Sequence, residues 1–516
     1  MAYEVFIEKK NETFLKVYSE EPCVHQELYE YFKVKDPSHR PNKFSKYDGM
    51  VRLYDRNSGE LPAGLFKSLL GRLKSYNLTF DDRFRNIRDI ERGELQEWLE
   101  SLKLPFTLYD YQFQLIYDAI RLRRLTGLAD TGAGKSVVIY CVVRFLYELK
   151  GEPLLIMAPS IMLVSQILQD FISYGWKEAA DVCQQIMEGR PKARRKPIII
   201  STWQSLKDMD RDYFSEFTTV IVDEVHGAQA KVQYSILQKC TSAVDRLGLT
   251  GTLSGEELHE KQIEGSFGPV KRYVDTQTLK DLGQASQTQV VMVHMKYSRL
   301  DRVRLSKLDY EGQLRYVMKH DGRQRAVASL VRGLAAKGEN SLVIFERVEE
   351  GLYQFKQILE DMGLGHKLRV IEGSVDLGTR DEIKRYTESD EGVILLATWG
   401  TLSTGVNIKK LHNLFLNSST KKLIRLLQTV GRLLRIHETK EVAKIFDFVD
   451  DTRESLSSRG FFVEHAKERV GHYASKKHPL KNLSVPLEDV QGVSKEDFET
   501  ILKESMKRAA KREEVK

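Results

Sequence analysis

The stretch Leu128-Ala-Asp-Thr-Gly-Ala-Gly-Lys-Ser136 decides how the rest of the chain is interpreted, because its composition is that of a phosphate-binding loop. Gly132 and Gly134 allow a tight backbone turn that directs consecutive N–H groups at one point. The apolar run at 137–146 is expected to form a helix, whose positive N-terminal end favours an anion. The stretch therefore predicts a loop that binds the phosphates of a nucleotide.

The positions of this loop have separate expected roles. Lys135 is expected to reach the β- and γ-phosphates, and the Ser136 hydroxyl is expected to bind Mg²⁺. The residues that surround the phosphates would be Thr131, Gly132, Ala133 and Gly134. The general pattern begins with Gly, whereas this stretch has Ala129 at that position. The alternative interpretation is a Gly-rich turn between a strand and a helix that binds no ligand.

A pair of carboxylates follows another apolar run further along the chain. Asp223-Glu-Val-His226 comes directly after the strand-like residues 219–222. The carboxyl end of a parallel strand faces the ligand crevice of such a sheet. Asp223 would hold Mg²⁺, and Glu224 would orient and deprotonate the attacking water. The alternative is an acidic pair at a helix N-terminus, but together with the phosphate loop the pair predicts an NTPase.

Two arginines in the second half of the chain suit the same chemistry. Arg432 and Arg435 lie three residues apart in Gln428-Thr-Val-Gly-Arg-Leu-Leu-Arg435, so a helix would present both on one face. Guanidinium groups that reach a γ-phosphate across a cleft stabilise the charge of phosphoryl transfer. The alternative is a surface helix that happens to carry two arginines.

Composition limits the classes of protein that fit. The 516 residues carry a formal net charge of +7 and are 41% hydrophobic, which suits roughly three or four folded domains. The charge permits a polyanionic partner but fits an ordinary basic enzyme equally well. The four cysteines are widely spaced and include no CxxC pair, so neither a zinc site nor a disulfide framework is expected. With no signal-peptide pattern and no apolar run of membrane length, we expect a cytoplasmic protein.

The pattern of apolar residues divides the chain into four expected parts. Residues 1–95 predict a small α+β domain, with strands at 3–8, 13–18 and 50–54 and helices at 25–34 and 65–76. Residues 96–270 and 271–455 alternate strands with helices, which predicts two parallel sheets covered on both faces. The strands are expected at 154–158, 197–202 and 219–223, then at 341–345, 368–372, 392–397 and 444–448. Residues 456–516 are polar and charged and are expected to form a helical extension.

A basic loop interrupts the first of these parts. Arg40, Lys43 and Lys46 surround Phe44 and Tyr47. Basic residues with interleaved aromatic rings suit a nucleic-acid backbone. The alternative is an ordinary solvated loop. Because the nucleotide-site residues all lie after residue 95, removal of residues 1–95 is expected to spare basal hydrolysis.

In their order and spacing, the motifs resemble those of superfamily 2 helicases and translocases. Leu108-Tyr-Asp-Tyr-Gln112 resembles the segment whose glutamine contacts adenine in that family. Five further segments resemble motifs of that family. Residues 158–160 with Gln166 resemble motif Ia, 201–205 resemble motif Ic, 250–252 resemble motif III, 343–345 resemble motif IV and 404–407 resemble motif V. The resemblance implies two tandem RecA-like domains that bind ATP and Mg²⁺ between them, with Gln112, Gly405 and Gln428 among the nucleotide contacts.

The same resemblance implies a grip on the phosphate backbone of one nucleic-acid strand. The residues that it places there are Pro159, Ser160, Gln166, Thr202, Trp203, Gln204, Arg347, Thr398, Thr404 and Asn407. Trp203 and Trp399 would either stack on bases or simply pack beside a motif.

The N-terminal part is similar to the DNA-binding domain of the phage UvsW-type helicases, in the segment 42–55 and in Leu61-Pro-Ala-Gly-Leu65. That likeness implies an ATP-dependent DNA helicase or translocase that remodels forks, Holliday junctions and R-loops in replication, recombination and repair. It further implies branched DNA as the partner, no membrane, a monomer, and the host cytoplasm if the protein is phage-encoded.

Three other functions remain open from the sequence. An RNA helicase would meet the same phosphates, although the full set of RNA-type motif sequences is missing. The translocase subunit of a restriction-type system should carry a nuclease or partner domain, and none is recognisable. A nucleic-acid-binding scaffold with an inactive ATP site would not need Lys135, Asp223, Glu224, Arg432 and Arg435 together.

Overall fold

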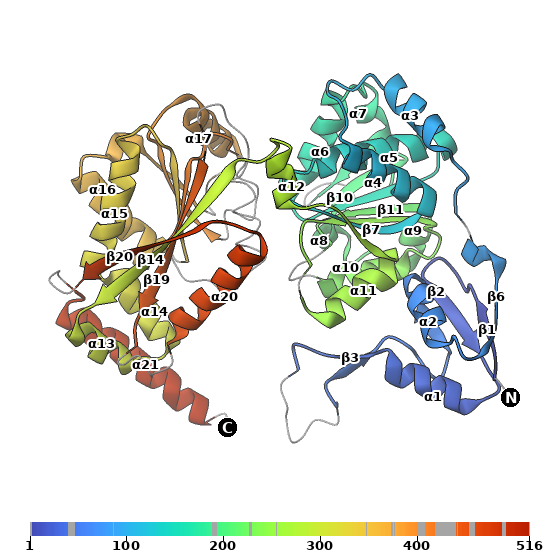
Figure 1. Ribbon diagram of the computed structural model, residues 1–516, viewed down its shortest axis with the longest axis horizontal. Helices are drawn as coiled ribbons and strands as arrows, with labels where there is room; N and C mark the ends of the chain where they lie inside the picture. Colours follow the sequence, from blue (N-terminus) through green and yellow to red (C-terminus); the bar gives the residue numbers. More distant parts are fainter. Residues whose placement is uncertain are drawn as a thin grey trace. The chain divides into compact units, whose positions relative to one another are not determined.

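The strands and helices that carry the predicted motifs can be followed in the computed structural model (Figure 1). It describes residues 3–39, 47–85, 87–187, 193–225, 230–253, 255–346, 348–372, 375, 377–399, 408–417, 440, 442–453, 460–487 and 492–514. The chain divides into two units, Met1–Asp275 and Thr276–Lys516, and each is described by itself.

The first unit begins with a small sheet in the strand order β5-β2-β1-β6. Buried and exposed residues alternate along β1 and β2, as they do in a strand with one covered face. β1 and β2 lie within the predicted strands 3–8 and 13–18 and pair antiparallel, with Phe6 opposite Tyr18. A separate two-stranded ribbon consists of β3 and β4. The bounds are β1 Glu4–Glu8, β2 Phe14–Tyr18, β3 Lys33–Lys35, β4 Met50–Arg52, β5 Glu60–Pro62 and β6 Asn77–Phe80.

Two helices cover the inner face of this small sheet. α1 (Pro22–Tyr31) and α2 (Phe66–Arg72) contribute buried leucines to a cluster with Val5, Ile7 and Leu15. A 3-10 turn, η1 (Ala63–Leu65), leads into α2, and a second, η2 (Asp82–Arg85), follows β6. The N-terminal part therefore has its own apolar core.

The main sheet of the first unit has seven described strands in the order β13-β7-β12-β11-β8-β10-β9. All of its pairings are parallel. Strands β8 and β10 are buried along their whole length, which explains why they appear in the sequence as continuous apolar runs. The bounds are β7 Arg124–Ala129, β8 Leu154–Ala158, β9 Cys183–Ile186, β10 Ile198–Thr202, β11 Thr219–Asp223, β12 Asp245–Thr250 and β13 Val270–Val274.

Helices connect these parallel strands. α4 packs against β7, β12 and β13, α6 packs against β8, β9 and β10, and α11 packs against β7 and β12. The described helices of this region are α3 Arg92–Ser101, α4 Asp110–Leu122, α5 Lys135–Lys150, α6 Ile161–Ser173, α7 Ala179–Val182, α8 Trp203–Leu206, α9 Arg211–Ser215, α10 Ala230–Lys239 and α11 Glu257–Phe267.

The second unit contains another sheet of seven described strands, in the order β16-β17-β15-β18-β19-β14-β20, again with parallel pairings. The prediction of an α/β chain with two parallel sheets after a small α+β domain is confirmed. The bounds are β14 Gln287–Tyr297, β15 Ser341–Phe345, β16 Leu368–Ile371, β17 Ile394–Thr398, β18 Asn413–Leu416, β19 Val442–Asp451 and β20 Leu480–Leu487.

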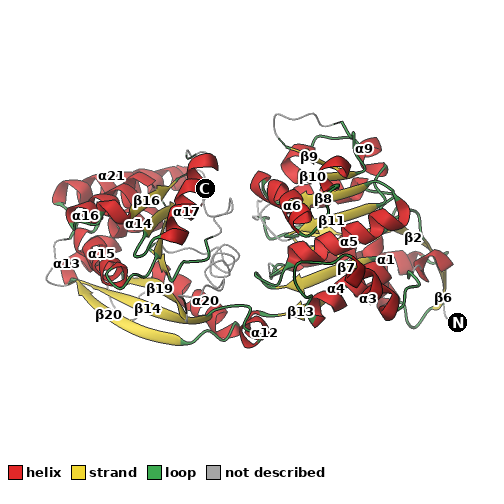
Figure 2. Ribbon diagram, turned by 90° about the horizontal axis from the view of Figure 1, so that it is seen from above, coloured by secondary structure: helices red, strands yellow, loops and turns green. Residues whose placement is uncertain are grey.

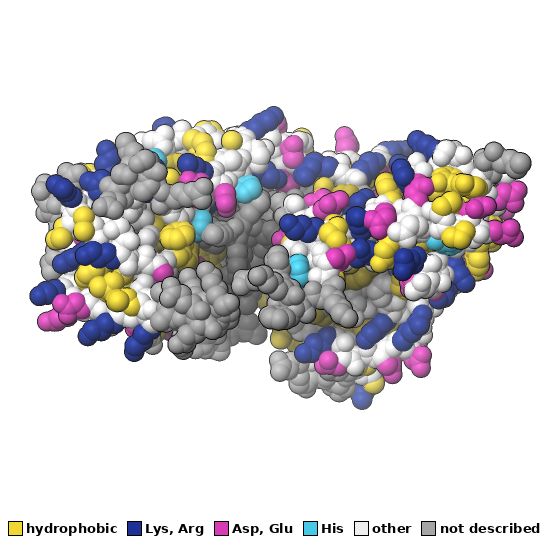
Figure 3. Space-filling view, turned by 90° about the horizontal axis from the view of Figure 1, so that it is seen from below, with side chains coloured by type: hydrophobic (Ala, Val, Ile, Leu, Met, Phe, Trp, Pro, Cys, Tyr) yellow, Lys and Arg dark blue, Asp and Glu magenta, His cyan; other side chains and the backbone are white. Residues whose placement is uncertain are grey.

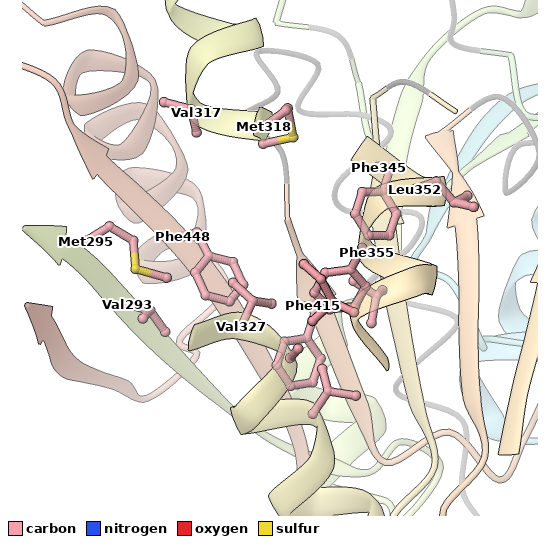
Figure 4. Packing of buried hydrophobic residues seen from close by; sticks show 14 of the residues in the cluster. Val293, Met295, Val317, Met318, Val327, Phe345, Leu352, Phe355, Phe415 and Phe448 are labelled. Atoms are coloured by element: carbon pink, nitrogen blue, oxygen red, sulfur yellow. The ribbon is translucent and has the colours of Figure 1, made fainter. Parts of the chain in front are cut away.

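An aromatic core holds this second sheet against its helices (Figure 4). Phe345 and Phe355 lie with ring centroids 5.3 Å apart, and Phe415 stacks on Phe446 at 4.5 Å. The described helices are α12 Thr276–Asp281, α13 Arg299–Ser306, α14 Tyr310–Lys319, α15 Asp321–Ala335, η3 Val348–Tyr353 (a π-helical turn), α16 Gln354–Asp361, η4 Gly365–Lys367, α17 Leu377–Ser389, α20 Phe461–Ser475 and α21 Lys495–Glu514.

Residues 456–516 differ from the helical extension that the sequence predicts. They do contain α20 and α21, but β20 between them joins the second sheet beside β14 (Figure 2). Phe462 of α20 and Ile501 of α21 lie in the core of the second unit. This segment is therefore part of that unit's fold. Among the described residues, no helix combines the length and the hydropathy that a membrane span requires.

Candidate nucleotide site

The phosphate loop connects β7 to α5, as the sequence predicts. β7 ends at Ala129 and α5 begins at Lys135. Gly132 and Gly134 have φ angles of 93° and 74°, a left-handed region that favours glycine. A Cβ on Gly134 would lie 2.4 Å from Gln112 Nε2. Any side chain at this position would therefore collide with the neighbouring helix, and the loop needs glycine there.

Gln112, in α4, is hydrogen-bonded to the phosphate loop. Its Nε2 donates to the Ala133 carbonyl over 3.0 Å, and its Oε1 accepts from the Tyr109 N–H over 3.0 Å. The Tyr111 hydroxyl donates to the same Ala133 carbonyl over 3.2 Å. Tyr111 is a loop contact that the sequence interpretation missed, and its place next to Gln112 in the chain is the only signal for it. The contacts of Gln112 observed here are with the chain itself.

Lys135 and the acidic pair meet in the first unit. Lys135 Nζ lies 3.0 Å from Glu224 Oε1 and donates to the Ala129 carbonyl over 3.4 Å. Burial lowers the pKa of Lys135, but the Glu224 and Asp223 carboxylates outweigh it, so the pKa lies above its ordinary value. The structure thus brings together residues that are far apart in the sequence.

Asp223 ends β11 with a carboxylate that is buried in the first unit. Its Oδ1 is buried and makes no hydrogen bond within the part of the chain that the structure describes. Burial, followed by the neighbouring Glu224 carboxylate, raises the pKa of Asp223 well above its usual value. A buried oxygen without a donor destabilises the site unless a ligand satisfies it. An oxygen-binding cation such as Mg²⁺ fits that position.

Glu224 adopts a backbone conformation that is rare for a residue with a side chain. Its φ of 57° lies in the left-handed region, which costs about 1–3 kcal/mol. Glu224 Oε2 also accepts a hydrogen bond of 3.3 Å from the hydroxyl of Thr250, at the end of β12. Strand β12 lies next to β11, with Asp223 in register with Leu249. The strained turn and Thr250 together hold the Glu224 carboxylate beside Lys135.

The segments expected to contact nucleic acid in the first unit end at one edge of the sheet. Thr202 is in register with Ala158, so Pro159 and Ser160 follow β8 where Gln204 follows β10. Pro159, Ser160 and Gln166 are half-buried, and Gln204 is exposed. This is the carboxyl edge of the sheet, which also carries the phosphate loop and Asp223.

Two residues at this edge do not fit the contacts expected of them. Trp203 is 6% exposed and lies in an apolar cluster with Leu155, Phe214 and Val222, so its ring packs in the core and offers no face to a base. Thr202 is 3% exposed, and its hydroxyl caps α8 by accepting from the Ser205 N–H over 3.3 Å. Side-chain contacts of these two residues with DNA stay a prediction, which their burial in this structure does not favour.

The predicted site residues of the second unit are only partly described. Thr398 ends β17 in register with Phe345, the last residue of β15, so these two strands end at the same edge of that sheet. Trp399 is 4% exposed, which indicates packing and no stacking on bases. The predicted site residues that lie outside the described residues are Arg40, Lys43, Lys46, Arg347, Thr404, Gly405, Asn407, Gln428, Arg432 and Arg435.

Two protein-family models match the chain. The family described as "Type III restriction enzyme, res subunit" matches residues 95–255, and "Helicase conserved C-terminal domain" matches residues 322–437. The first range contains Lys135, Asp223 and Glu224, and the second contains Arg432 and Arg435. The residues singled out for nucleotide chemistry therefore fall within the matched regions.

Similar proteins extend the likeness beyond these two regions. The chain is 27% identical over 490 residues to "ATP-dependent DNA helicase uvsW" of Enterobacteria phage T4, covering 90% of this chain and 96% of that protein. It is similar to the crystal structure of T4 UvsW, with 25% identity over 94% of this chain and 100% of that chain and a TM-score of 0.48. The structure of "ATP-dependent Type ISP restriction-modification enzyme LlaBIII bound to DNA" shares the fold, with 16% identity, a TM-score of 0.55 and coverage of 78% of this chain and 33% of that chain. The chain is accordingly an ATP-hydrolysing helicase that belongs to superfamily 2 and is of the UvsW type.

Proposed function

We propose that this helicase is an ATP-driven DNA motor that remodels branched DNA, such as forks, Holliday junctions and R-loops, during replication, recombination and repair. The observation that carries the proposal is the extent of the likeness to a protein named as a DNA helicase. It covers 90% of this chain and 96% of that relative, so it cannot be confined to the two matched helicase regions. The proposed division of the chain is 1–95, 96–270 and 271–455, with residues 456–516 as a C-terminal segment that belongs to the second unit.

In the proposed reaction, Lys135 binds the β- and γ-phosphates and offsets part of their charge. Ser136 and Asp223 would hold Mg²⁺, which supplies further charge neutralisation at the phosphate oxygens when bound. Glu224 orients the attacking water and accepts its proton, while the water oxygen bonds to the γ-phosphorus and the bond to the ADP oxygen breaks. The 3.0 Å pairing of Lys135 with Glu224 supports these roles, because it places the phosphate ligand next to the base.

The second unit would complete the site when ATP is bound. Arg432 and Arg435 would stabilise the charge that develops on the γ-phosphate, and Gly405 and Gln428 would add nucleotide contacts. Binding and hydrolysis would then close and open the two units in turn, because ATP favours the state in which both contact it. Alternating closure moves the protein along one strand.

The proposed grip on that strand comes from both units. In the first unit it uses Pro159, Ser160, Gln166 and Gln204, and in the second it uses Arg347, Thr398, Thr404 and Asn407. The carboxyl edge shared by 159–160 and Gln204 supports this arrangement. On the face shown in Figure 3, Lys and Arg side chains are interspersed with Asp and Glu over the described residues. The net charge of +7 alone therefore does not define the path of the DNA.

The N-terminal domain would select branched substrates by holding a duplex arm while a monomeric motor pulls one strand. The proposed contacts are Arg40, Lys43 and Lys46. The test is to compare affinity for a four-way junction with affinity for single-stranded DNA at matched salt, using Lys43→Glu together with Lys46→Glu. We expect a selective loss of junction affinity and a smaller salt dependence, because fewer counterions are released.

Two exposed lysines of the same domain provide the control. Lys67→Glu together with Lys74→Glu makes the same charge change outside the loop and should leave the ratio of junction to single-strand affinity unchanged. If the loop variant lost affinity for both DNAs equally, or for neither, the loop would not be the element that recognises branched DNA. A junction with one RNA strand in the same assay would show whether the motor distinguishes the two sugars.

A further inference from the structure

Two consecutive residues between β1 and β2 connect the N-terminal domain to the main sheet of the first unit. Glu12 Oε2 lies 3.2 Å from Arg124 Nη2, and the Glu12 N–H donates to the Thr241 carbonyl over 3.0 Å. Thr13 Oγ1 accepts a hydrogen bond of 2.8 Å from Arg246 Nη2. Adjacent residues of one domain therefore hold two arginines of the other.

These two arginines occupy equivalent positions in neighbouring strands. Arg124 and Arg246 are partners in the register of β7 and β12. At its other end, β7 leads into the phosphate loop, and β12 ends at Thr250, which contacts Glu224. Four or five residues of strand span about 13–17 Å. The N-terminal domain thus holds the amino ends of the two strands whose carboxyl ends form the nucleotide site.

The contact between Thr13 and Arg246 is enclosed. Thr13 is 3% exposed and Arg246 is 1% exposed. The other observed acceptors for the Arg246 guanidinium are the backbone carbonyls of Leu237, Cys240, Ala243 and Ser266. Thr13 Oγ1 itself donates to the Cys240 carbonyl over 3.2 Å. The Thr13 hydroxyl is therefore the side-chain acceptor that the N-terminal domain provides to this buried cation.

A second contact holds the helix that follows Thr250. α11 begins a few residues after the 250–252 segment. The Ser68 hydroxyl of α2 donates to Glu264 Oε1 over 2.9 Å. A Cβ on Gly64 would lie 2.0 Å from the Glu264 carbonyl oxygen, so the two backbones meet without a side chain between them. The N-terminal domain therefore contacts both β12 and α11, the two elements that flank the 250–252 segment beside Glu224.

We propose that the N-terminal domain also controls the rate of ATP hydrolysis, with Thr13 and Glu12 as positioning residues that set Thr250 against Glu224 through β12 and α11. This inference rests on the proposed role of Glu224 as the base. A packed sheet transmits a displacement because its interior has no space in which to absorb it. DNA held by the N-terminal domain would then change the turnover of the motor through the same connection, as a coupling between two sites.

The test is Thr13→Val, which keeps the shape of the side chain and removes the acceptor for Arg246. We expect kcat for ATP, measured with saturating single-stranded DNA, to fall about fivefold or more, the lower end of ordinary coupling between sites. The KM for ATP and the single-strand affinity should not change. Thr13→Ser restores the hydroxyl and should restore kcat. Thr79→Val, on the exposed face of β6, is the matched control and should behave like the unmodified protein.

The outcomes separate positioning from simple docking. Thr13→Val could lower the melting temperature and yet leave kcat unchanged at temperatures where the variant is folded. The contact would then only stabilise the fold, and the inference would be wrong. If Thr13→Val does not fold, Ser68→Ala decides in the same assays: a lower kcat at constant KM supports the inference, and an unchanged kcat overturns it. Glu224→Gln is measured alongside, because normal turnover in that variant would instead overturn the assignment of Glu224.

Discussion

Lys135 Nζ and Glu224 Oε1 lie 3.0 Å apart, so the residue proposed to bind the phosphates pairs with the residue proposed to activate water. ATP must take Lys135 away from Glu224 before its phosphates can occupy the loop. The same exchange releases the Glu224 carboxylate, which is then available to a water molecule. Binding of the nucleotide and activation of the base are in this way one event.

Lys135→Ala should abolish ATP hydrolysis and leave DNA affinity largely intact. The substitution removes the cation that the β- and γ-phosphates require, whereas the strand-gripping segments at 159–160 and Gln204 do not contact Lys135. Phosphate release and single-strand binding measure the two effects. Lys177→Ala, an exposed lysine of the same unit, is the control. Turnover near that of the unmodified protein in Lys135→Ala would contradict the site assignment.

Glu224→Gln should bind ATP at least as tightly as the unmodified protein and hydrolyse it slowly. An amide holds a water molecule but cannot accept its proton, and it pairs less strongly with Lys135, which leaves the lysine available to the phosphates. We expect the variant to accumulate in a DNA-bound, ATP-bound state. Equilibrium binding of a fluorescent ATP analogue and single-turnover hydrolysis test this pair of effects. A loss of ATP binding would assign Glu224 a structural role.

Arg435→Ala should lower the rate of hydrolysis by roughly 10³–10⁵, as loss of an arginine finger does, with a much smaller effect on ATP affinity. Arg432→Ala should act similarly and weaken closure of the two units. Both residues lie outside the described residues, so this prediction rests on the spacing in the sequence and on the match of residues 322–437 to the helicase C-terminal family. Normal turnover in both variants would mean that the second unit does not complete the site.

The strands that carry the site could be predicted from the sequence for a physical reason. β8, β11 and β15 are buried on both faces, so each is a continuous apolar run with clear ends. β20 could not be predicted in this way, because residues 480–484 are all exposed and show no apolar pattern. Its place in the sheet depends on β14, which is far away in the sequence.

The nucleotide site likewise has features that a local sequence pattern predicts and features that depend on contacts between distant residues. The phosphate loop and the acidic pair are local patterns, and the sequence predicts both. The contact between Thr250 and Glu224 depends on the register of β11 with β12 and on the left-handed φ of Glu224, neither of which a local pattern contains. Trp203 shows the same limit: its motif is a local pattern, but the burial of its ring depends on packing around β10, which that pattern does not contain.

Acid should loosen the C-terminal helix α21 from the second unit. The hydrogen bond from Arg508, with those from Ser505 and Gly312, holds the pKa of Asp309 well below its usual value. Since the pKa is depressed in the folded state, this stabilisation is complete above the unfolded value of about 3.9 and is lost progressively as the pH falls from that value through the lower folded one. The melting temperatures of the unmodified protein and of Asp309→Asn should therefore differ most at pH 7, and the difference should shrink as the pH falls below about 4. A constant difference would contradict this role.

Removal of residues 1–95 should damage the motor, although the sequence alone predicts that basal hydrolysis survives. Arg88 donates to both carboxylate oxygens of Asp245 at 3.0 Å, and Asp245 begins β12. The deletion removes this guanidinium and leaves the buried carboxylate with Lys150, whose Nζ lies 3.6 Å from Asp245 Oδ2. The destabilisation should therefore be smaller than the about 3–5 kcal/mol of a buried charge that loses its partner entirely. The deletion also removes the Thr13 hydroxyl, which accepts a hydrogen bond from the buried Arg246.

We therefore expect the truncated protein to melt at a lower temperature and to hydrolyse ATP slowly even without DNA. A shorter deletion of residues 1–85 retains Arg88 and loses Thr13, so it separates the two contributions. Thermal denaturation gives the melting temperatures of the two truncated proteins. Phosphate release, measured at a temperature where both remain folded, then compares their rates of ATP hydrolysis. If the protein lacking residues 1–95 kept full basal turnover and the melting temperature of the intact chain, the contacts of Asp245 and Arg246 with the N-terminal region would be dispensable, and the first unit would fold independently of it.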